Sequence, residues 1–593
     1  MKDDVDSKFI LGCFVFLAVI IFSFNNTPLF DQDEAAYAGF AKNMLESKNW
    51  LFPEFMWSDI HRKTPLHFWN IAIVYKLIGV NEFAVRFSSS LFVFLTYVIV
   101  YKLGKKIVNT QQAFYASMIL ATSLLVPSLG KMAVTDGTLL FFNTLCTFSL
   151  IFILKNKSWK WVIIFWISFS LALLCKGPPI IIFCSLFGIL LLIHPKRKNL
   201  IILHPWIFLP IAALPVMMWG YFTIQEDGGE LLLWMWDWYV VKRVNSSVLG
   251  QTGPPGTHLL LIVLFFLPWL TLVPKGLKAI YYGLIKTKHN SFLIASWFVS
   301  SWLIFEFSPS KLPSYVVSAH IPFAFFISFQ LDKISSIVKI KYWIIIAIFF
   351  QAIIWMIALP TINNLRNNTL KVSNYIQEKG IPKSHVLVGN NDYHPPSLPF
   401  YLSRLNHKLG FDNNLSTLIW QYYQNDPLTL VLNENQKDLF KKLIPNIKID
   451  TIGRSEFLSG FLCKYYIISK PTNNISYHST FLYKDQLSII PTSKKDYRKN
   501  IKNNLKWQNS IREKAKKYNK SYEIQIKEDI DWLYTQDSLL YIYQKEMYKN
   551  PRWMKDLKLK QKKSNQSIEE ILKQDLLIIK NNSNNGLGFT KFF

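Results

Sequence analysis

Long apolar runs separated by short Lys-rich segments fill residues 1–360, and they constrain the fold more than any other feature. A helix needs about 20 apolar residues to cross the hydrocarbon core of a bilayer. Runs of roughly 15–22 such residues predict about eleven crossings. We expect them at Phe9–Phe24, Ala84–Tyr101, Gln112–Leu129, Thr138–Leu154, Trp161–Leu174, Pro179–Ile193, Pro205–Phe222, His258–Val273, Phe292–Phe307, Tyr315–Phe329 and Tyr342–Leu359. The predicted fold of this part is an all-α membrane bundle.

Positive charge alternates between the loops and predicts their orientation. Lys and Arg gather at residues 102–106, 155–160, 196–198, 275–288 and 333–341, together with Lys2 and Lys8. Because such charges stay preferentially in the cytoplasm, the opposite loops at 25–83 and 223–257 are expected outside. In a bacterium this is an inner-membrane protein with chemistry on the periplasmic face. The first apolar run lacks a small-residue cleavage site and is interpreted as a retained span, with a signal peptide as the alternative.

The composition changes after residue 360. Strands are predicted at Ser384–Gly389, Leu428–Leu432 and Leu462–Ser469, and helices at Leu370–Lys379, Gln436–Leu443 and Ile568–Lys580. We therefore expect residues 361–593 to form a periplasmic α/β domain. This tail carries much of the net charge of +28, which either favours an anionic membrane surface or reflects an Asn/Lys/Ile-biased composition. The charged stretch 494–520 is typical of a surface helix, and no nucleic-acid partner is expected.

Three carboxylates stand in the outer loops. Asp33 and Glu34 follow the turn-forming residues 25–28 and begin a helical pattern, while Asp136 lies on an Asp-Gly turn between two spans. Acidic residues in a first turn can simply favour the helix dipole, and Asp-Gly is a common turn. Carboxylates this close to the hydrocarbon are also often functional. Both interpretations remain open from the residues alone.

Four cations accompany these acids on the same side. Lys63 precedes an amphipathic run, and its side chain could snorkel to the headgroups or neutralise a carrier phosphate. Lys176 ends a span before Gly177 and Pro178, where a structural role at the helix end is the simpler reading. Arg243 lies in the large Trp-rich outer loop and Lys311 in a short outer turn.

If the helices form a bundle, these groups converge on one cavity at membrane level. Acids suit a general base or a divalent metal site, with Asp33 and Asp136 as the metal ligands if there is one. Cations suit a phosphate leaving group. Five cysteines, four of them within or at the ends of apolar runs, imply no disulfide framework, and there is no Cys/His cluster at zinc spacing.

The ordered set of outer motifs resembles a known family. It comprises Asp33-Glu34-x-x-Tyr37, Lys63-x-Pro65-Leu66-x-x-Trp69, Gly79-Val80-Asn81-Glu82-Phe83-Ala84-x-Arg86, Thr135-Asp136, Lys176-Gly177-Pro178 and Ser310-Lys311-Leu312-Pro313-x-Tyr315. Order and spacing are similar to those of the bacterial aminoarabinose lipid A transferases and the related protein O-mannosyltransferases, which are GT-C integral-membrane glycosyltransferases. The resemblance covers roughly residues 1–330.

The resemblance implies an inverting transfer of a sugar from a polyprenyl-phosphate carrier, without a nucleotide sugar. It assigns Asp33 as the catalytic carboxylate, with Glu34 beside it and Asp136 as its partner. Lys63 is then the ligand of the carrier phosphate. The other implied substrate-binding residues are Tyr37, Arg86, Lys176, Arg243 and Lys311. Asp33 acts as general base if the acceptor is a hydroxyl, and it positions the acceptor or holds a cation if the acceptor is a lipid A phosphate.

Two positions depart from the family pattern. The aminoarabinose transferases have a His three positions before the loop arginine, where this chain has Val240, and the aromatic expected shortly before Lys63 is absent, with Ile60 nearby. The expected function is transfer of a sugar, with an amino sugar as the leading donor, to lipid A or a related envelope glycolipid. The alternatives are a protein O-mannosyltransferase and a transporter of a lipid-linked sugar. Sugar, acceptor, metal requirement and oligomeric state are not set by the sequence.

Overall fold

The computed structural model describes most of the membrane part and portions of the tail, and the chain divides into two compact units, 1–367 with 395–400 and 368–394 with 401–593. The described residues are 6–23, 27–55, 58–242, 251–334, 336–366, 368–379, 385–389, 396–404, 408–412, 428–432, 436–438, 441, 447–452, 465–470, 494, 497–498, 501, 505–517, 520–531 and 533–534. Each unit is considered by itself.

The first unit is helical throughout its described part. Its α-helices are α1 (Ser7–Phe22), α2 (Asp33–Ser47), α3 (Leu66–Ile78), α4 (Glu82–Gly104), α5 (Thr110–Ala121), α6 (Leu125–Lys131), α7 (Thr135–Lys155), α8 (Trp159–Lys176), α9 (Pro179–Leu191), α10 (Pro205–Asp227), α11 (Glu230–Trp236), α13 (Thr257–Phe265), α14 (Val273–Ile285), α15 (Asn290–Glu306), α16 (His320–Ile334), α17 (Ile337–Ile353) and α18 (Leu359–Arg366). Shorter elements are the 3-10 helices η1 (Asp59–His61), η2 (Arg197–Leu203), η4 (Leu270–Leu272) and η5 (Pro313–Ala319), and the π-helices η3 (Asp237–Val241) and η6 (Ile354–Ala358).

The apolar runs become membrane-length helices in only part of the described chain. Six helices are long and apolar enough to cross a bilayer, or up to seven if the bent pair α5 and α6 counts as one span. That pair corresponds to the predicted span Gln112–Leu129 and bends by 63°. The predicted spans Phe9–Phe24, Pro179–Ile193 and His258–Val273 contain shorter helices of 16, 13 and 9 residues. The chain is therefore a multi-pass membrane protein, and the number eleven stays a prediction.

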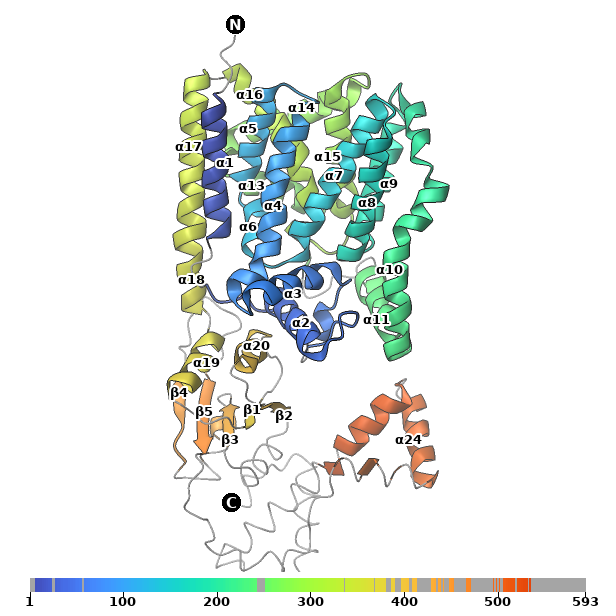
Figure 1. Cartoon of the computed structure of the whole chain (residues 1–593), viewed down its shortest axis with the longest axis vertical. Helices are drawn as coiled ribbons and strands as arrows, with labels where there is room; N and C mark the ends of the chain where they lie inside the picture. The colour runs from blue at the N-terminus through green and yellow to red at the C-terminus, as the bar shows by residue number, and fades with distance from the viewer. Residues whose placement is uncertain are drawn as a thin grey trace, which may run out of the picture. The chain divides into compact units, whose positions relative to one another are not determined.

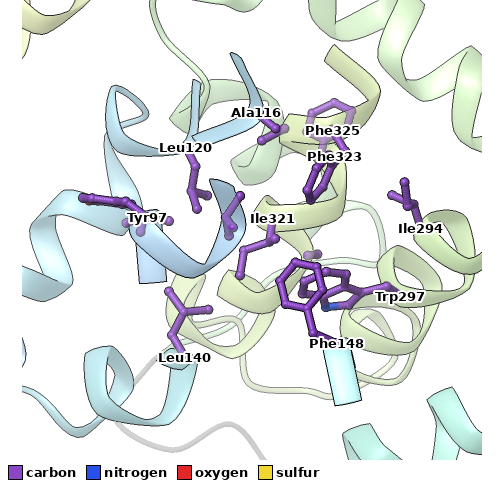
Figure 2. Packing of buried hydrophobic residues seen from close by; sticks show 14 of the residues in the cluster. Tyr97, Ala116, Leu120, Leu140, Phe148, Ile294, Trp297, Ile321, Phe323 and Phe325 are labelled. Carbon is purple, nitrogen blue, oxygen red and sulfur yellow. The ribbon is translucent and has the colours of Figure 1, made fainter. Parts of the chain in front are cut away.

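Aromatic and aliphatic side chains hold the long helices together. Figure 2 shows Phe148 of α7 packed against Trp297 of α15, beside Phe323 and Phe325 of α16. The rings of Phe148 and Trp297 meet edge to face with centroids 5.4 Å apart, a favoured geometry for aromatic pairs. Because lipid tails are as apolar as these side chains, dispersion contacts and close fit stabilise the bundle more than exclusion of water does.

Two helices lie across one end of the bundle. Figure 1 shows α2 and α3 across the ends of the long helices α4, α7 and α8. The turn Gly79 to Asn81 between α3 and α4 explains the change of direction, because Gly79 has a φ of 82° and Asn81 caps α4 by accepting the Ala84 N–H at 2.8 Å. The segment 27–78 thus brings Asp33 and Lys63 to the helix ends that carry Asp136 and Lys176.

The second unit contains a five-stranded mixed sheet. Its strands are β1 (His385–Gly389), β2 (Lys408–Asp412), β3 (Leu428–Leu432), β4 (Asp450–Ile452) and β5 (Tyr465–Lys470), in the order β2-β1-β3-β5-β4. β1 pairs in parallel with β2 and β3, whereas β5 pairs antiparallel with β3 and β4. Described helices of the tail are α19 (Thr369–Glu378), α20 (Ser397–Ser403), which begins within the first unit, and α24 (Leu505–Lys517).

The strands predicted at Ser384–Gly389, Leu428–Leu432 and Leu462–Ser469 correspond to β1, β3 and β5, and the helix predicted at Leu370–Lys379 corresponds to α19. β2 was not predicted because its sequence KLGFD contains Gly and Asp, which strands disfavour. Half of the helix predicted at Gln436–Leu443 and all of that at Ile568–Lys580 lie outside the described residues. The periplasmic position of this unit stays a prediction.

Candidate functional site

Asp33 is the first residue of α2. Its carboxylate sits in the first turn, where the helix dipole favours negative charge. The side chain is 54 % exposed and Oδ1 lies 2.7 Å from His61 Nδ1. His61 comes from η1, far along the loop, and its ring is buried. The loop therefore folds back to hold the Asp33 carboxylate from one side and leaves the other side open.

Cations surround this carboxylate and keep it charged. Dense packing around Asp33 raises its pKa, but the hydrogen bond from His61 and the positive charges of Lys63 and Lys176 outweigh it. The net result lowers the pKa of Asp33 to about 2. The Asp33 carboxylate is thus exposed to solvent and lies near charged groups, and we call Asp33, His61, Lys63 and Lys176 the Asp33 cluster. At neutral pH Asp33 is an ionised hydrogen-bond acceptor.

Lys63, which belongs to the Asp33 cluster, lies over the aromatic ring of Tyr239. Its ammonium is 3.6 Å from the centroid of the Tyr239 ring, in the range of a cation–π contact. Tyr239 belongs to η3, and its hydroxyl donates to the carbonyl oxygens of Ile60 at 3.1 Å and Arg62 at 2.9 Å. The second outer loop thus fastens the segment that carries His61 and Lys63. A fixed cation beside an ionised acid suits an anionic ligand.

Asp136 and Lys176 form a second charged pair at the same end. Asp136 lies in the first turn of α7 and Lys176 at the last residue of α8, so each charge complements its helix dipole. Lys176 Nζ is 2.7 Å from Asp136 Oδ1, and the two side chains are 16 % and 13 % exposed. Because Lys176 also lowers the pKa of Asp33, its charge acts on both acids.

Tyr37 lies one turn along α2 from Asp33 and is buried. Burial, and then the charges of Asp33 and Asp136 among others, raise the pKa of its phenol well above the ordinary value. Tyr37 therefore keeps its proton and offers an O–H donor next to the two acids. The structure thus gathers five predicted site residues in one place: Asp33, Tyr37, Lys63, Asp136 and Lys176.

A cleft opens beside Asp136, between α7, α9, α15 and η5. The space between these side chains is about 390 Å³ when open solvent is included, of which the centre of a water-sized sphere can occupy about 30 Å³. Polar groups from Asn143, Ser301, Ser314, Tyr315 and Ser318 line it, and apolar groups from Leu139, Ile180, Phe183 and Phe305 form the wall. Asn143 donates to Ser318 Oγ at 2.6 Å. Asn143 Oδ1 and Ser301 Oγ are buried without a hydrogen-bond partner within the described residues. Such atoms are costly unless a ligand or water satisfies them.

Glu34 and Arg86 are adjacent to the site but closed to it. Both side chains are almost wholly buried, and Arg86 grips Glu34 in a two-pronged pair at 2.8 and 2.9 Å. Glu34 also accepts the N–H groups of Phe30 and Ala133 at 2.7 and 2.8 Å. Arg86 donates further to the carbonyl oxygens of residues 27 and 28 at 2.7 and 2.9 Å. The pair thus ties the first loop to α4 and to the residues before α7.

Lys311 is likewise occupied by the protein. Its ammonium lies 3.7 Å from Glu306 Oε1 and donates to the carbonyl oxygens of Phe305 and Glu306 at the end of α15. The carboxylate of Glu306 caps the start of α13 by accepting N–H groups from Gly256 at 2.7 Å and Leu259 at 3.0 Å. Lys311 therefore joins two helix ends. Arg243 lies outside the described residues.

The two carboxylates predicted as ligands of a possible divalent cation have partners within the protein. The carboxylate of Asp33 is held by His61, and that of Asp136 by Lys176. Within the described ranges no three His, Cys, Asp or Glu side chains are grouped to hold a metal. The metal site at Asp33 and Asp136 stays a prediction, and no step below uses a metal.

Sequence reasoning missed His61, Tyr239, Glu306 and Asn143. His61 stands two residues before Lys63, and that proximity was the one signal available. Tyr239 contacts Ile60 across 179 residues, and Glu306 contacts Gly256 across 50. Such pairings depend on the packing of the bundle, which a single sequence does not display.

Helices that are long and apolar enough to cross a bilayer, with the charged residues of the Asp33 cluster at their ends, define a class: a multi-pass membrane protein. A crystal structure of ArnT from Cupriavidus metallidurans bound to undecaprenyl phosphate matches with a TM-score of 0.64 at 15% identity, covering 78% of this chain and 98% of that chain. Its apo form matches with a TM-score of 0.62, covering 77% and 97%. At this identity the likeness shows the fold alone.

Sequence comparisons point to the same group. The model of the family described as dolichyl-phosphate-mannose-protein mannosyltransferase matches residues 62–221. The undecaprenyl phosphate-alpha-4-amino-4-deoxy-L-arabinose arabinosyl transferase 2 of Proteus mirabilis is 27% identical over 315 residues, 52% of this chain and 56% of the relative. Transferase 1 of that name from Pseudomonas fluorescens is 26% identical, covering 50% and 54%.

The predicted resemblance to the aminoarabinose and mannosyl transferases of the GT-C fold is confirmed. The chain spans about half the length of the curated relatives that it matches.

Proposed function

We propose that this protein transfers a sugar from a polyprenyl-phosphate carrier to an acceptor at the outer face of the bacterial inner membrane. The observation that carries the proposal is the exposed carboxylate of Asp33, which lies near the cations Lys63 and Lys176 from two separate segments. The names of the relatives and the shared fold support a lipid-linked donor. Lipid A or a related envelope glycolipid is the leading acceptor, and an amino sugar, aminoarabinose or a hexosamine, the leading donor.

The cations would bind and stabilise the carrier phosphate. Lys63 is held by its contact with the Tyr239 ring, and Lys176 is paired with Asp136. As the bond from the anomeric carbon to the phosphate oxygen breaks, its electron pair passes to the phosphate, which gains negative charge. Fixed cations stabilise that charge without reorganising. Arg243 remains a proposed further phosphate ligand from the large outer loop.

The acceptor oxygen would attack the anomeric carbon from the opposite face, which inverts the configuration. The exposed carboxylate of Asp33 would face the acceptor, and Tyr37 adds a protonated hydroxyl near it. The products are the glycosylated acceptor and the free polyprenyl phosphate. The donor sugar would occupy the cleft beside Asp136, where Asn143, Ser301 and Tyr315 match sugar hydroxyls.

Glu34, Arg86 and Lys311 have a different role in this proposal. Each of these charges is paired with a partner inside the protein, so these residues would support the Asp33 cluster without contacting substrate. The polyprenyl chain would lie among membrane lipids, the tail unit would be periplasmic, and the protein would have no nucleic-acid partner.

The match to the protein mannosyltransferase family favours a second candidate, in which the acceptor is a protein hydroxyl. Mass spectrometry of lipid A from a deletion strain, complemented with the wild type or with Asp33→Asn, tests the lead. Loss of one sugar mass, restored by the wild type alone, would support it. Unchanged lipid A with altered periplasmic glycoproteins would favour the second candidate, the protein acceptor. No change in lipid A or in glycoproteins would overturn both candidate functions.

A further inference from the structure

The segment that leads into α2, and so into Asp33, is held by side chains from distant parts of the chain. Arg86 of α4 donates to the carbonyl oxygens of Thr27 and Pro28 at 2.7 and 2.9 Å. The side-chain amide of Asn363 on α18 donates to the Pro28 carbonyl oxygen as well, and Asn363 is buried. Two helices that are far apart in the sequence therefore fix the start of this segment.

A residue of the tail holds the same segment nearer to the site. Ser397 begins α20 and lies in the stretch 395–400 that belongs to the first compact unit. Its hydroxyl donates to Oδ1 of Asp31, 366 residues away in the sequence. Ser397 is completely buried, and so are Leu398 and Phe400. Packed neighbours thus fix the donor, and a hydroxyl that donates to a carboxylate forms one of the stronger hydrogen bonds in proteins.

Gln32, between Asp31 and Asp33, has a strained backbone. Its φ is 70° and its ψ is −117°, a combination that glycine adopts readily and other residues rarely. Such a conformation persists only where the surrounding structure enforces it. Ser397 holds the residue before Gln32, and the Ala36 N–H donates to the Gln32 carbonyl oxygen at 3.0 Å. The strained turn is therefore held from both sides, directly before Asp33.

We propose that Ser397 is a positioning residue for the carboxylate of Asp33. By holding Asp31, its hydroxyl keeps the strained turn at Gln32 in place, and that turn sets where α2 presents Asp33. The inference rests on the proposed function and extends its site to a residue of the tail. The Asp33 side chain is 54 % exposed, so the backbone before it has a large share in fixing its position. A displacement of about 1 Å in a reacting group can cost about 10²-fold in rate.

A merely structural contact is the alternative, in which the hydrogen bond only satisfies the buried hydroxyl of Ser397. The two roles predict different losses. A structural contact lowers the stability of the fold and leaves the turnover of each folded molecule unchanged. A positioning contact lowers kcat, because the acceptor would be held in a less productive place, and leaves KM for the donor unchanged, because Lys63 and Lys176 would bind the carrier phosphate independently.

The test measures sugar transfer by the purified full chain. The donor is polyprenyl-phosphate sugar extracted from membranes, and the acceptor is lipid A or a peptide. Ser397→Ala should lower kcat by about tenfold and change KM for the donor by less than about twofold. Asp31→Ala should have the same effect, and it serves if Ser397→Ala does not fold, because Asp31 is exposed. The double variant should cost no more than either single variant, since both remove one interaction.

Two further variants give results that a merely structural contact would not produce. Asp31→Asn keeps an acceptor oxygen for the Ser397 hydroxyl and should retain most of kcat. Gln32→Gly added to Ser397→Ala should recover part of the lost rate, because glycine adopts this backbone conformation without a contact that enforces it. Ser336→Ala is the matched control. Ser336 is exposed before α17 and makes no capping hydrogen bond with its side chain, so kcat and the unfolding temperature in detergent should equal those of the wild type.

Three outcomes would overturn the inference, and they differ in what they leave standing. If the wild type transfers sugar and both Ser397→Ala and Asp31→Ala keep its kcat and stability, the positioning role is wrong and the proposed function survives. If these variants lose thermal stability but keep kcat per folded molecule, the contact is structural, and again only the inference falls. If the wild type transfers no sugar to any acceptor, the proposed function falls and the positioning role with it.

Discussion

Asp33 and Glu34 are neighbours in the sequence but belong to two regions with opposite character. The Asp33 side chain is 54 % exposed and accepts a hydrogen bond from His61. The Glu34 side chain is completely buried and accepts two bonds from Arg86 and two from backbone N–H groups. The exposed carboxylate of Asp33 can still accept hydrogen bonds from a ligand. In the buried cluster of Glu34 and Arg86, the carboxylate oxygens accept hydrogen bonds that join loops and helices. Carboxylates of the same type at the same helix end can therefore have separate tasks.

The buried cluster should break first, and with the largest effect. Arg86→Ala leaves the Glu34 carboxylate buried without its charge partner, which typically costs about 3–5 kcal/mol. We expect a large fall in the unfolding temperature in detergent and a low yield of folded protein. Glu523→Gln is the control, because Glu523 and its partner Arg498 are 67 % and 55 % exposed and the pair should matter by under about 0.5 kcal/mol. An unfolding temperature of Arg86→Ala equal to that of the wild type would contradict the scaffold role.

Two lysines sharpen the comparison further. Lys63→Met should reduce turnover by about 10²–10³-fold, the range for loss of one fixed transition-state contact, and leave the unfolding temperature nearly unchanged. Lys311→Met should instead destabilise the fold by about 1–3 kcal/mol, because the buried Glu306 loses its cation and two carbonyls lose a donor. Steady-state rates and thermal unfolding of both variants decide the matter. A loss of stability in Lys63→Met together with a loss of turnover alone in Lys311→Met would contradict the roles that we assign to the two lysines.

Ser301 tests the cleft beside Asp136. Its hydroxyl is buried and has no hydrogen-bond partner within the described residues, so Ser301→Ala removes an unsatisfied group and should leave stability equal or slightly higher. If the hydroxyl binds the donor sugar, KM for the donor should rise by about five- to tenfold, equivalent to one neutral hydrogen bond. Ser168→Ala, at a buried serine of α8 outside the cleft lining, serves as the control. An unchanged KM would remove the sugar from this cleft.

The smallest effect is the pH dependence of stability at Asp33. Its folded pKa is lowered to about 2, below the unfolded value of about 3.9. The ionised carboxylate therefore contributes stability that is complete above about pH 4. This contribution is lost as the pH falls toward about 2. Because the side chain is half exposed, we expect under about 1 kcal/mol. The difference in unfolding temperature between wild type and Asp33→Asn should shrink over that range, and a growing difference would oppose the assignment.

The sequence predicted those features that depend on local pattern. The apolar runs located the long helices, and the β-branched segments located β1, β3 and β5. The ordered motifs indicated the neighbourhood of Asp33, Lys63 and Asp136. The sequence could not show that Asp33 and Glu34 have different roles, because the partner of Glu34 is Arg86, 52 residues along the chain. The bend between α5 and α6 and the short α13 were also missed, since apolar composition does not report where a helix breaks.

The most direct test of the two-region account compares Asp33→Asn with Glu34→Gln, each close in shape to the native residue. Both are measured for unfolding temperature in detergent and for restoration of the missing sugar on the envelope acceptor in a deletion strain. The account predicts that Asp33→Asn folds like the wild type but fails to restore the sugar. It predicts that Glu34→Gln loses thermal stability and restores the sugar in proportion to the folded protein that remains. An active, stable Asp33→Asn variant together with a stable, inactive Glu34→Gln variant would contradict it.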